Sequence, residues 1–99
     1  MLVHTVFFYL KPEVSEEEKA AFMKRVEKLG EIETVVALYV GTPAETPPRP
    51  VIKTDYSVSL TAVFDHIADQ NIYQDHPIHL EFVDNNKDLW TTVAVYDAD

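Results

Sequence analysis

The stretch Leu2–Leu10, which reads LVHTVFFYL, decides the fold of this chain. Aromatic and β-branched residues dominate it, as is typical of a β-strand, and Lys11-Pro12 ends it because proline cannot donate to a strand ladder. Successive side chains of a strand point to opposite faces, so the apolar residues divide into two sets. One face carries Leu2, Val6, Phe8 and Leu10, and the other carries Val3, Phe7 and Tyr9. Both faces of this strand are therefore predicted to be buried.

The rest of the chain alternates between helical and extended patterns. Ser15 and Glu18 have the spacing of a capping box, which predicts a helix from this point to about Leu29. Further helices are predicted over 64–73 and 79–88, strands over 34–40, 54–63 and 89–96, and a proline-rich loop over 42–52. The order β-α-β-β-α-β predicts an α+β fold, a ferredoxin-like sandwich of one antiparallel sheet with its helices on one face. Residues 1–99 are expected to form a single domain.

The sheet face opposite the helices needs a second cover. The strand predicted over 34–40 is apolar on both faces, like the first strand, and the helices can cover only one side. The other side would expose a larger apolar patch than monomers usually tolerate. We therefore expect a homodimer in which two such sheets face each other, that is, a dimeric α/β barrel.

Composition limits the classes of partner. Asp and Glu number 17 against 8 Lys and Arg, which gives a formal net charge of −9. Nucleic acid and anionic membranes attract cationic surfaces, so neither is expected as a partner. The chain has no cysteine, which excludes a disulfide framework and a thiolate nucleophile. No apolar run approaches the ~20 residues needed to span a bilayer, and a cytoplasmic protein is predicted.

Candidate chemistry concentrates in the segment Tyr73–His79, which reads YQDHPIH. A histidine that titrates near neutral pH can accept a proton, and a nearby tyrosine can donate a hydrogen bond to a carbonyl or an oxyanion. His4 lies in the first strand, and we interpret it either as a core histidine with one hydrogen bond or as the floor of a cavity. Asp97, at the end of a strand expected beside the first, could orient an imidazole ring.

A metal site is the weaker alternative for the same segment. Neutral imidazole is a common metal ligand, and His76 and His79 lie three residues apart. No third ligand follows at a spacing typical of metal sites, so we predict no metal and no cofactor.

Over essentially its whole length, the chain resembles the stress-responsive dimeric A/B barrel domain proteins. The resemblance rests on His4-Thr5-Val6, Gly41, Tyr56, Tyr73…His76-Pro77…His79…Phe82-Val83 and Val95-Tyr96-Asp97. It implies a ferredoxin-like homodimer with a small cavity between the sheet and the helices of each subunit. A plant member of the family is a polyketide cyclase that forms olivetolic acid by a cofactor-independent aldol condensation. Similarity to it implies catalytic roles for His79 and Tyr73, supported by His4 and Asp97.

Three functional hypotheses remain open. The first is a domain of unassigned activity with a small-molecule pocket lined by His4, Tyr73 and His79. The second is a cofactor-independent cyclase or lyase that acts on an apolar, carbonyl-bearing, polyketide-like substrate. The third is a purely structural, stress-associated dimer. In the first two, further ligand contacts are expected from His76, Phe8, Phe22, Val26 and Phe64. Whether the protein is an enzyme is left open.

Overall fold

The computed structural model describes residues 1–99. Its elements in chain order are β1 (Leu2–Leu10), α1 (Glu16–Glu27), β2 (Ala37–Gly41), β3 (Val58–Phe64), α2 (Ile67–Asp75), α3 (Pro77–Asn86) and β4 (Trp90–Ala98). Short 3-10 turns at Lys28–Glu31 and Lys87–Leu89 follow α1 and α3. The predicted β-α-β-β-α-β order is confirmed, with two consecutive helices, α2 and α3, in the second helical region. None of these helices has the length and apolar character needed to cross a membrane.

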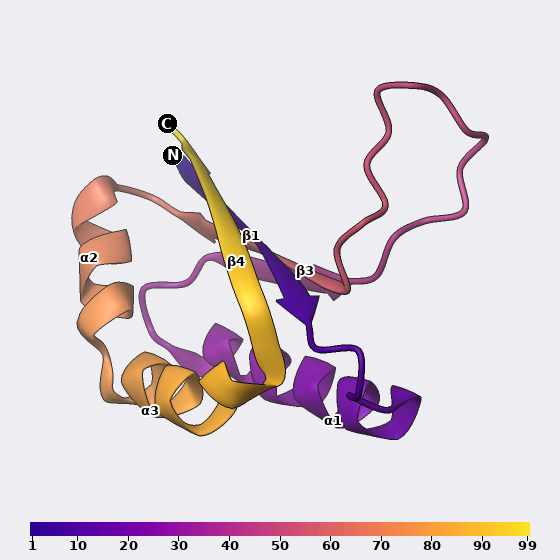
Figure 1. Cartoon of the computed structure of the whole chain (residues 1–99). Coiled ribbons are helices and arrows are strands. Elements are labelled where there is room, and N and C mark those ends of the chain that lie inside the picture. Colours follow the sequence, from indigo (N-terminus) through magenta and orange to yellow (C-terminus); the bar gives the residue numbers. More distant parts are fainter.

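The strands form one antiparallel sheet in the order β2-β3-β1-β4, and all helices lie on one side of it (Figure 1). The predicted α+β ferredoxin-like architecture is therefore confirmed. Alternate residues of the two central strands are buried on the helix side, namely Leu2, His4, Val6 and Phe8 of β1 and Val58, Leu60, Ala62 and Phe64 of β3. This inner face and the helices enclose the core.

Two boundaries differ from prediction in a way that affects the site. Phe64 is not the first residue of a helix but the last residue of β3, where it continues the alternation of buried side chains. Helix α2 begins only after His66, and its one buried residue is Tyr73. The reason is that burial of the Phe64 ring against the core outweighs the helical pattern that follows it. Tyr73 thus becomes the side chain through which α2 meets the sheet.

Helix α1 is held by the predicted cap and by a polar link to α3. The Ser15 hydroxyl accepts a hydrogen bond from the backbone N–H of Glu18, and the Glu18 carboxylate accepts one from the backbone N–H of Ser15. At the other end, Arg25 Nε donates to Asn86 Oδ1 at 2.7 Å, and Asn86 Nδ2 donates to the carbonyl of Phe82 at 2.8 Å. Because Asn86 is buried, this link sets the position of α3 over the sheet.

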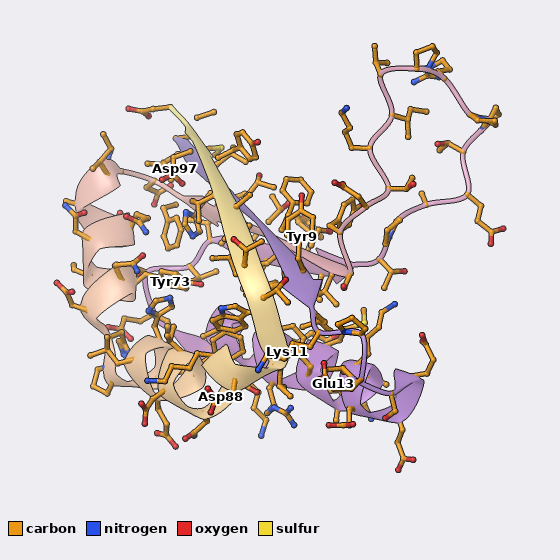
Figure 2. All side chains as sticks on the ribbon, in the orientation of Figure 1. Tyr9, Lys11, Glu13, Tyr73, Asp88 and Asp97 are labelled. Atoms are coloured by element: carbon orange, nitrogen blue, oxygen red, sulfur yellow. The ribbon has the colours of Figure 1, made fainter.

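The chain covers the apolar side chains on the outer face of the sheet only in part, since Val3, Phe7 and Tyr9 are half-buried. Phe7 packs edge-to-face on Tyr56 and Tyr96, with ring centroids 4.8 Å and 6.0 Å away. Tyr96 remains 66% exposed, and Figure 2 shows Tyr9 on the side of the sheet away from α2. The loop before β3 extends away from the body of the domain (Figure 1). The apolar outer face predicted from the β1 pattern is therefore present.

Candidate active site

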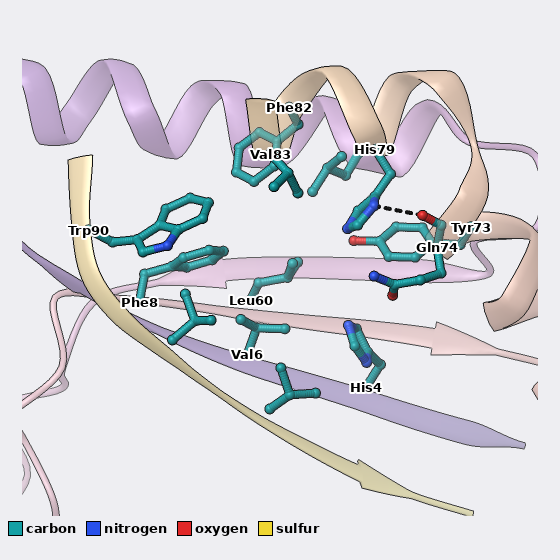
Figure 3. Close-up of a pocket in the computed structure, with 13 residues that line it drawn as sticks. His4, Val6, Phe8, Leu60, Tyr73, Gln74, His79, Phe82, Val83 and Trp90 are labelled. Carbon is teal, nitrogen blue, oxygen red and sulfur yellow. Dashed lines mark hydrogen bonds between the residues drawn. The ribbon is translucent and has the colours of Figure 1, made fainter. Parts of the chain in front are cut away.

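A cavity of about 180 Å³ lies between the inner face of the sheet and the helices α2 and α3 (Figure 3). Polar side chains gather at one end and aromatic rings at the other. Its lining residues are His4, Val6, Phe8, Leu29, Leu60, Tyr73, Gln74, His79, Phe82, Val83, Trp90, Val93 and Val95. It can accept a compact molecule with an apolar body and one polar end.

His79, on the first turn of α3, projects into the polar end. Its Nδ1 lies 3.0 Å from the backbone carbonyl of Gln74, and Figure 3 marks this bond. Because a carbonyl oxygen can only accept, Nδ1 carries the hydrogen and Nε2 of the neutral ring keeps a free lone pair. Burial, with a smaller contribution from nearby His4, lowers the pKa of His79, although the Gln74 carbonyl and Asp75 oppose this. His79 is therefore a neutral base at pH 7.

His4 and Asp97 lie side by side on the adjacent strands β1 and β4. They are direct partners in the register between β1 and β4, and His4 Nδ1 lies 2.5 Å from Asp97 Oδ1. The His4 side chain is buried, whereas Asp97 remains half exposed at the sheet edge. The carboxylate accepts the hydrogen on Nδ1 and so fixes the orientation of the His4 ring, which lines the cavity. The expected proximity of these two residues is thus observed.

Tyr73 supplies the donor at this end. The residue is 1% exposed, and its ring lies between those of His4 and His79, whose centroids are 5.9 Å and 4.8 Å away. No hydrogen bond within the chain involves its hydroxyl, which Figure 3 shows opening on the cavity beside His79. Burial raises the pKa of Tyr73, so the phenol stays protonated. The site therefore offers one unused donor next to a free base.

Three aromatic rings form the opposite end. Trp90 packs on Phe8 and Phe82, with centroid distances of 5.3 Å and 6.3 Å, and Phe8 lies 6.2 Å from Phe82. Rings at these separations suit offset or edge contacts with a further ring. The aromatic end can therefore hold the apolar part of a ligand.

The sequence matches the model of the stress responsive A/B barrel domain over residues 2–99. The chain belongs to this family. No curated protein matches it. A solved structure of a family protein with a ferredoxin-like fold from Mesorhizobium loti is 26% identical, with a TM-score of 0.81 over 99% of this chain and 94% of that one. The resemblance inferred from the motifs is thus confirmed.

Two other solved structures share the fold of this A/B barrel domain. Hydroxynitrile lyase from Passiflora edulis is 19% identical, with a TM-score of 0.81 over 98% of this chain and 90% of that one. A dimeric ferredoxin-like protein of unknown function from Bacteroides fragilis is 23% identical, with a TM-score of 0.74 over 99% and 94% of the two chains. The fold therefore occurs both in an enzyme and in a protein without an assigned activity.

The structure brings some of the predicted ligand contacts to the cavity and not others. Phe8 lines it, but Phe22, Val26 and Phe64 are fully buried in the core and are not among the lining residues. They lie one layer deeper, since the ring of Phe22 packs behind Phe8 at a centroid distance of 5.1 Å and Phe64 packs against Tyr73. A pattern of apolar residues in the sequence does not distinguish residues that line a cavity from core residues behind them.

His76 also lies away from the cavity. Its Nδ1 accepts a hydrogen bond from the backbone N–H of Ile78 at 3.1 Å and caps α3, while its Nε2 lies 3.3 Å from a carboxylate oxygen of Glu33. His76 and His79 therefore have separate partners. No group of three His, Cys, Asp or Glu side chains is placed to hold a metal ion.

Sequence reasoning missed several walls of the cavity. Gln74 lies inside the motif but has no catalytic side-chain chemistry of its own, and a tryptophan at the start of a strand is as typical of a packed core as of a cavity wall. Val93 and Val95 follow from pairing, because they are opposite Phe8 and Val6 in the β1–β4 register. Phe82 lies three residues after His79 and hence on the same helix face. Strand register and helix period could have predicted these residues as cavity walls. Both can be applied only once the order of helices and strands is known.

Proposed function

We propose that this A/B barrel domain binds a small, largely apolar carbonyl compound and removes a proton from the carbon next to the carbonyl, without a cofactor. One observation carries the proposal: the free Nε2 of His79 lies beside the unbonded hydroxyl of Tyr73 in a nearly apolar cavity. A base and an oxyanion donor at one point are the two groups that enolate formation requires.

In the proposed reaction, the substrate carbonyl oxygen accepts a hydrogen bond from Tyr73. His79 Nε2 takes a proton from the adjacent carbon, the C–H electron pair forms the enolate, and the negative charge develops on the oxygen held by Tyr73. The enolate is then reprotonated on carbon by His79, or its carbon attacks a second carbonyl carbon, whose C=O π electrons move to the oxygen, and that oxygen takes the proton from His79. In both cases the base returns to its neutral form. His4, oriented by Asp97, presents a second polar ring that can hold an oxygen of the substrate.

The cavity supports a substrate of about one ring. An apolar cavity of about 150 Å³ can hold benzene, and the cavity here measures about 180 Å³. Phe8, Phe82 and Trp90 offer ring faces and edges at the end opposite the base. The occurrence of a hydroxynitrile lyase on this fold supports an enzymatic role for such a pocket.

The proposal includes a homodimer formed through the outer sheet face. On that face Phe7 contacts both Tyr56 and Tyr96, and Tyr96 remains 66% exposed. An exposed aromatic patch of this kind is typical of a subunit interface. The dimeric Bacteroides fragilis protein of the same fold supports this arrangement. The pocket lies on the opposite face of the sheet and stays accessible in such a dimer.

Binding of propiophenone tests the site. The control ligand is the matching alkene, in which a methylene group replaces the carbonyl oxygen of propiophenone. Trp90 is the single tryptophan and lines the cavity, so its fluorescence reports binding. We expect the ketone to bind about three- to tenfold more tightly, the value of one net hydrogen bond. Exchange of the ketone's methylene protons in D₂O, followed by NMR, measures proton removal.

The variants His79→Gln and His66→Gln separate the base from a general effect of losing a histidine. His66 is exposed and lies outside the cavity, so its replacement should leave exchange unchanged. The His79 variant should slow exchange by about a hundred- to a thousandfold. Equal binding of ketone and alkene, or exchange that survives in the His79 variant, would contradict the proposal.

A further inference from the structure

Gln74 contributes to the polar end through two separate groups. Its backbone carbonyl accepts the Nδ1 hydrogen of His79, and its side chain lines the cavity. Gln70, one helical turn earlier on α2, donates from its Nε2 to Gln74 Oε1 at 2.9 Å. With that oxygen engaged by Gln70, the Nε2 end of the Gln74 amide is turned to the cavity side (Figure 3).

This arrangement leaves a donor without a partner at the cavity mouth. The structure contains no acceptor for the Gln74 amide hydrogens, while the Tyr73 hydroxyl is a second unused donor deeper in the site. A ligand with one carbonyl oxygen can satisfy Tyr73 and leaves the amide of Gln74 to water. A ligand with a second oxygen acceptor can satisfy both.

We infer that Gln74, oriented by Gln70, selects ligands that carry a second oxygen acceptor beside the carbonyl held by Tyr73. The inference rests on the proposed function and specifies its substrate class: a one-ring, oxygen-substituted ketone such as an aryl diketone. Gln74 is the residue that contacts the ligand, and Gln70 is a positioning residue that acts through it.

Substitutions at Gln70 test the orientation of the Gln74 side-chain amide without replacing a residue that lines the cavity. In Gln70→Lys the side chain still donates, so Gln74 keeps its oxygen toward position 70 and its N–H groups toward the ligand. In Gln70→Glu the side chain accepts, so the Gln74 amide turns over and presents its oxygen to the ligand. Both side chains are long and sit at a helix surface, so both variants should fold like the parent.

The probes are phenylpropanedione and propiophenone, which differ by one carbonyl oxygen. We expect the parent and Gln70→Lys to bind the diketone about three- to tenfold more tightly than propiophenone. Gln70→Glu should abolish or reverse this preference. Gln74→Leu should also abolish it, because the leucine side chain has no N–H group to donate to the second oxygen.

The side-chain NH₂ resonances of Gln74 provide an independent readout, since a direct contact requires them to shift with the diketone and not with propiophenone. Equal affinity for the two probes in the parent, or equal preferences in the Lys and Glu variants at position 70, would overturn the role of Gln74. That result would leave the proposed function standing if propiophenone still binds. Failure of propiophenone itself to bind would overturn both.

Discussion

Replacing Tyr73 with phenylalanine should separate stability from activity. The residue is 1% exposed, and its hydroxyl opens on the cavity without a hydrogen bond within the chain, so its removal breaks no native bond. Burial of a polar group without a partner costs stability, and its removal should therefore leave the free energy of unfolding unchanged or raise it by up to about 1 kcal/mol. For a domain of this size, about 1 kcal/mol corresponds to an increase in Tm of roughly 4–8 °C.

The effect on proton exchange should have the opposite sign. Without the hydroxyl, the developing enolate oxygen has lost its donor, and the loss of one such donor slows catalysis by about a hundred- to a thousandfold. Tm would be measured by circular dichroism at one fixed protein concentration, because a dimer's Tm depends on concentration. Exchange of propiophenone protons would be followed by NMR on the same samples.

A matched control removes a buried hydroxyl elsewhere. Thr34 Oγ1 is buried without a hydrogen-bond partner and lies outside the cavity. Thr34→Val should therefore change Tm in the same direction as Tyr73→Phe and leave exchange unaffected. A clear fall in Tm for Tyr73→Phe would show that its hydroxyl has a structural role, and unchanged exchange would show that it has no catalytic one. Either result would refute the reasoning.

Two further predictions concern pH and assembly. Because burial lowers the pKa of His79 below its ordinary value of about 6.5, the unfolded chain binds a proton there that the folded chain does not. The free energy of unfolding, measured by urea titration, should consequently fall as pH drops below about 6.5, and it should fall less steeply with pH in His79→Gln. Equal pH dependence of the free energy of unfolding in the parent and the variant would contradict the lowered pKa. The rate of proton exchange, measured by NMR, should rise with pH and level off by neutrality. Phe7→Glu should place a charge in the aromatic cluster of the outer face and give a monomer by light scattering. The control Ala20→Glu, on the exposed side of α1, should remain a dimer. A dimeric Phe7→Glu protein would place the interface elsewhere.

The element order follows from local patterns because each of them reports on nearby residues. The aromatic and β-branched residues of β1 predicted a strand with two apolar faces, and the capping box at Ser15 predicted the start of α1. The same local reasoning misplaced Phe64, since its helical neighbours follow it directly while its burial depends on Tyr73 and His4, which are distant in sequence. Boundaries fail where a tertiary contact competes with the local pattern.

The sequence by itself determined the strand that builds the sheet, the apolar character of its two faces and the identity of the residues His4, Tyr73, His79 and Asp97 as chemical candidates. Only the tertiary structure decided what surrounds them. The β1–β4 register set Asp97 against His4, and the turn between α2 and α3 brought the Gln74 carbonyl to His79. A cavity exists where packed side chains fail to fill the space between layers, and that depends on contacts among residues far apart in the chain. For this reason Phe22 and Val26 belong to the core, and Gln74 and Trp90 line the site.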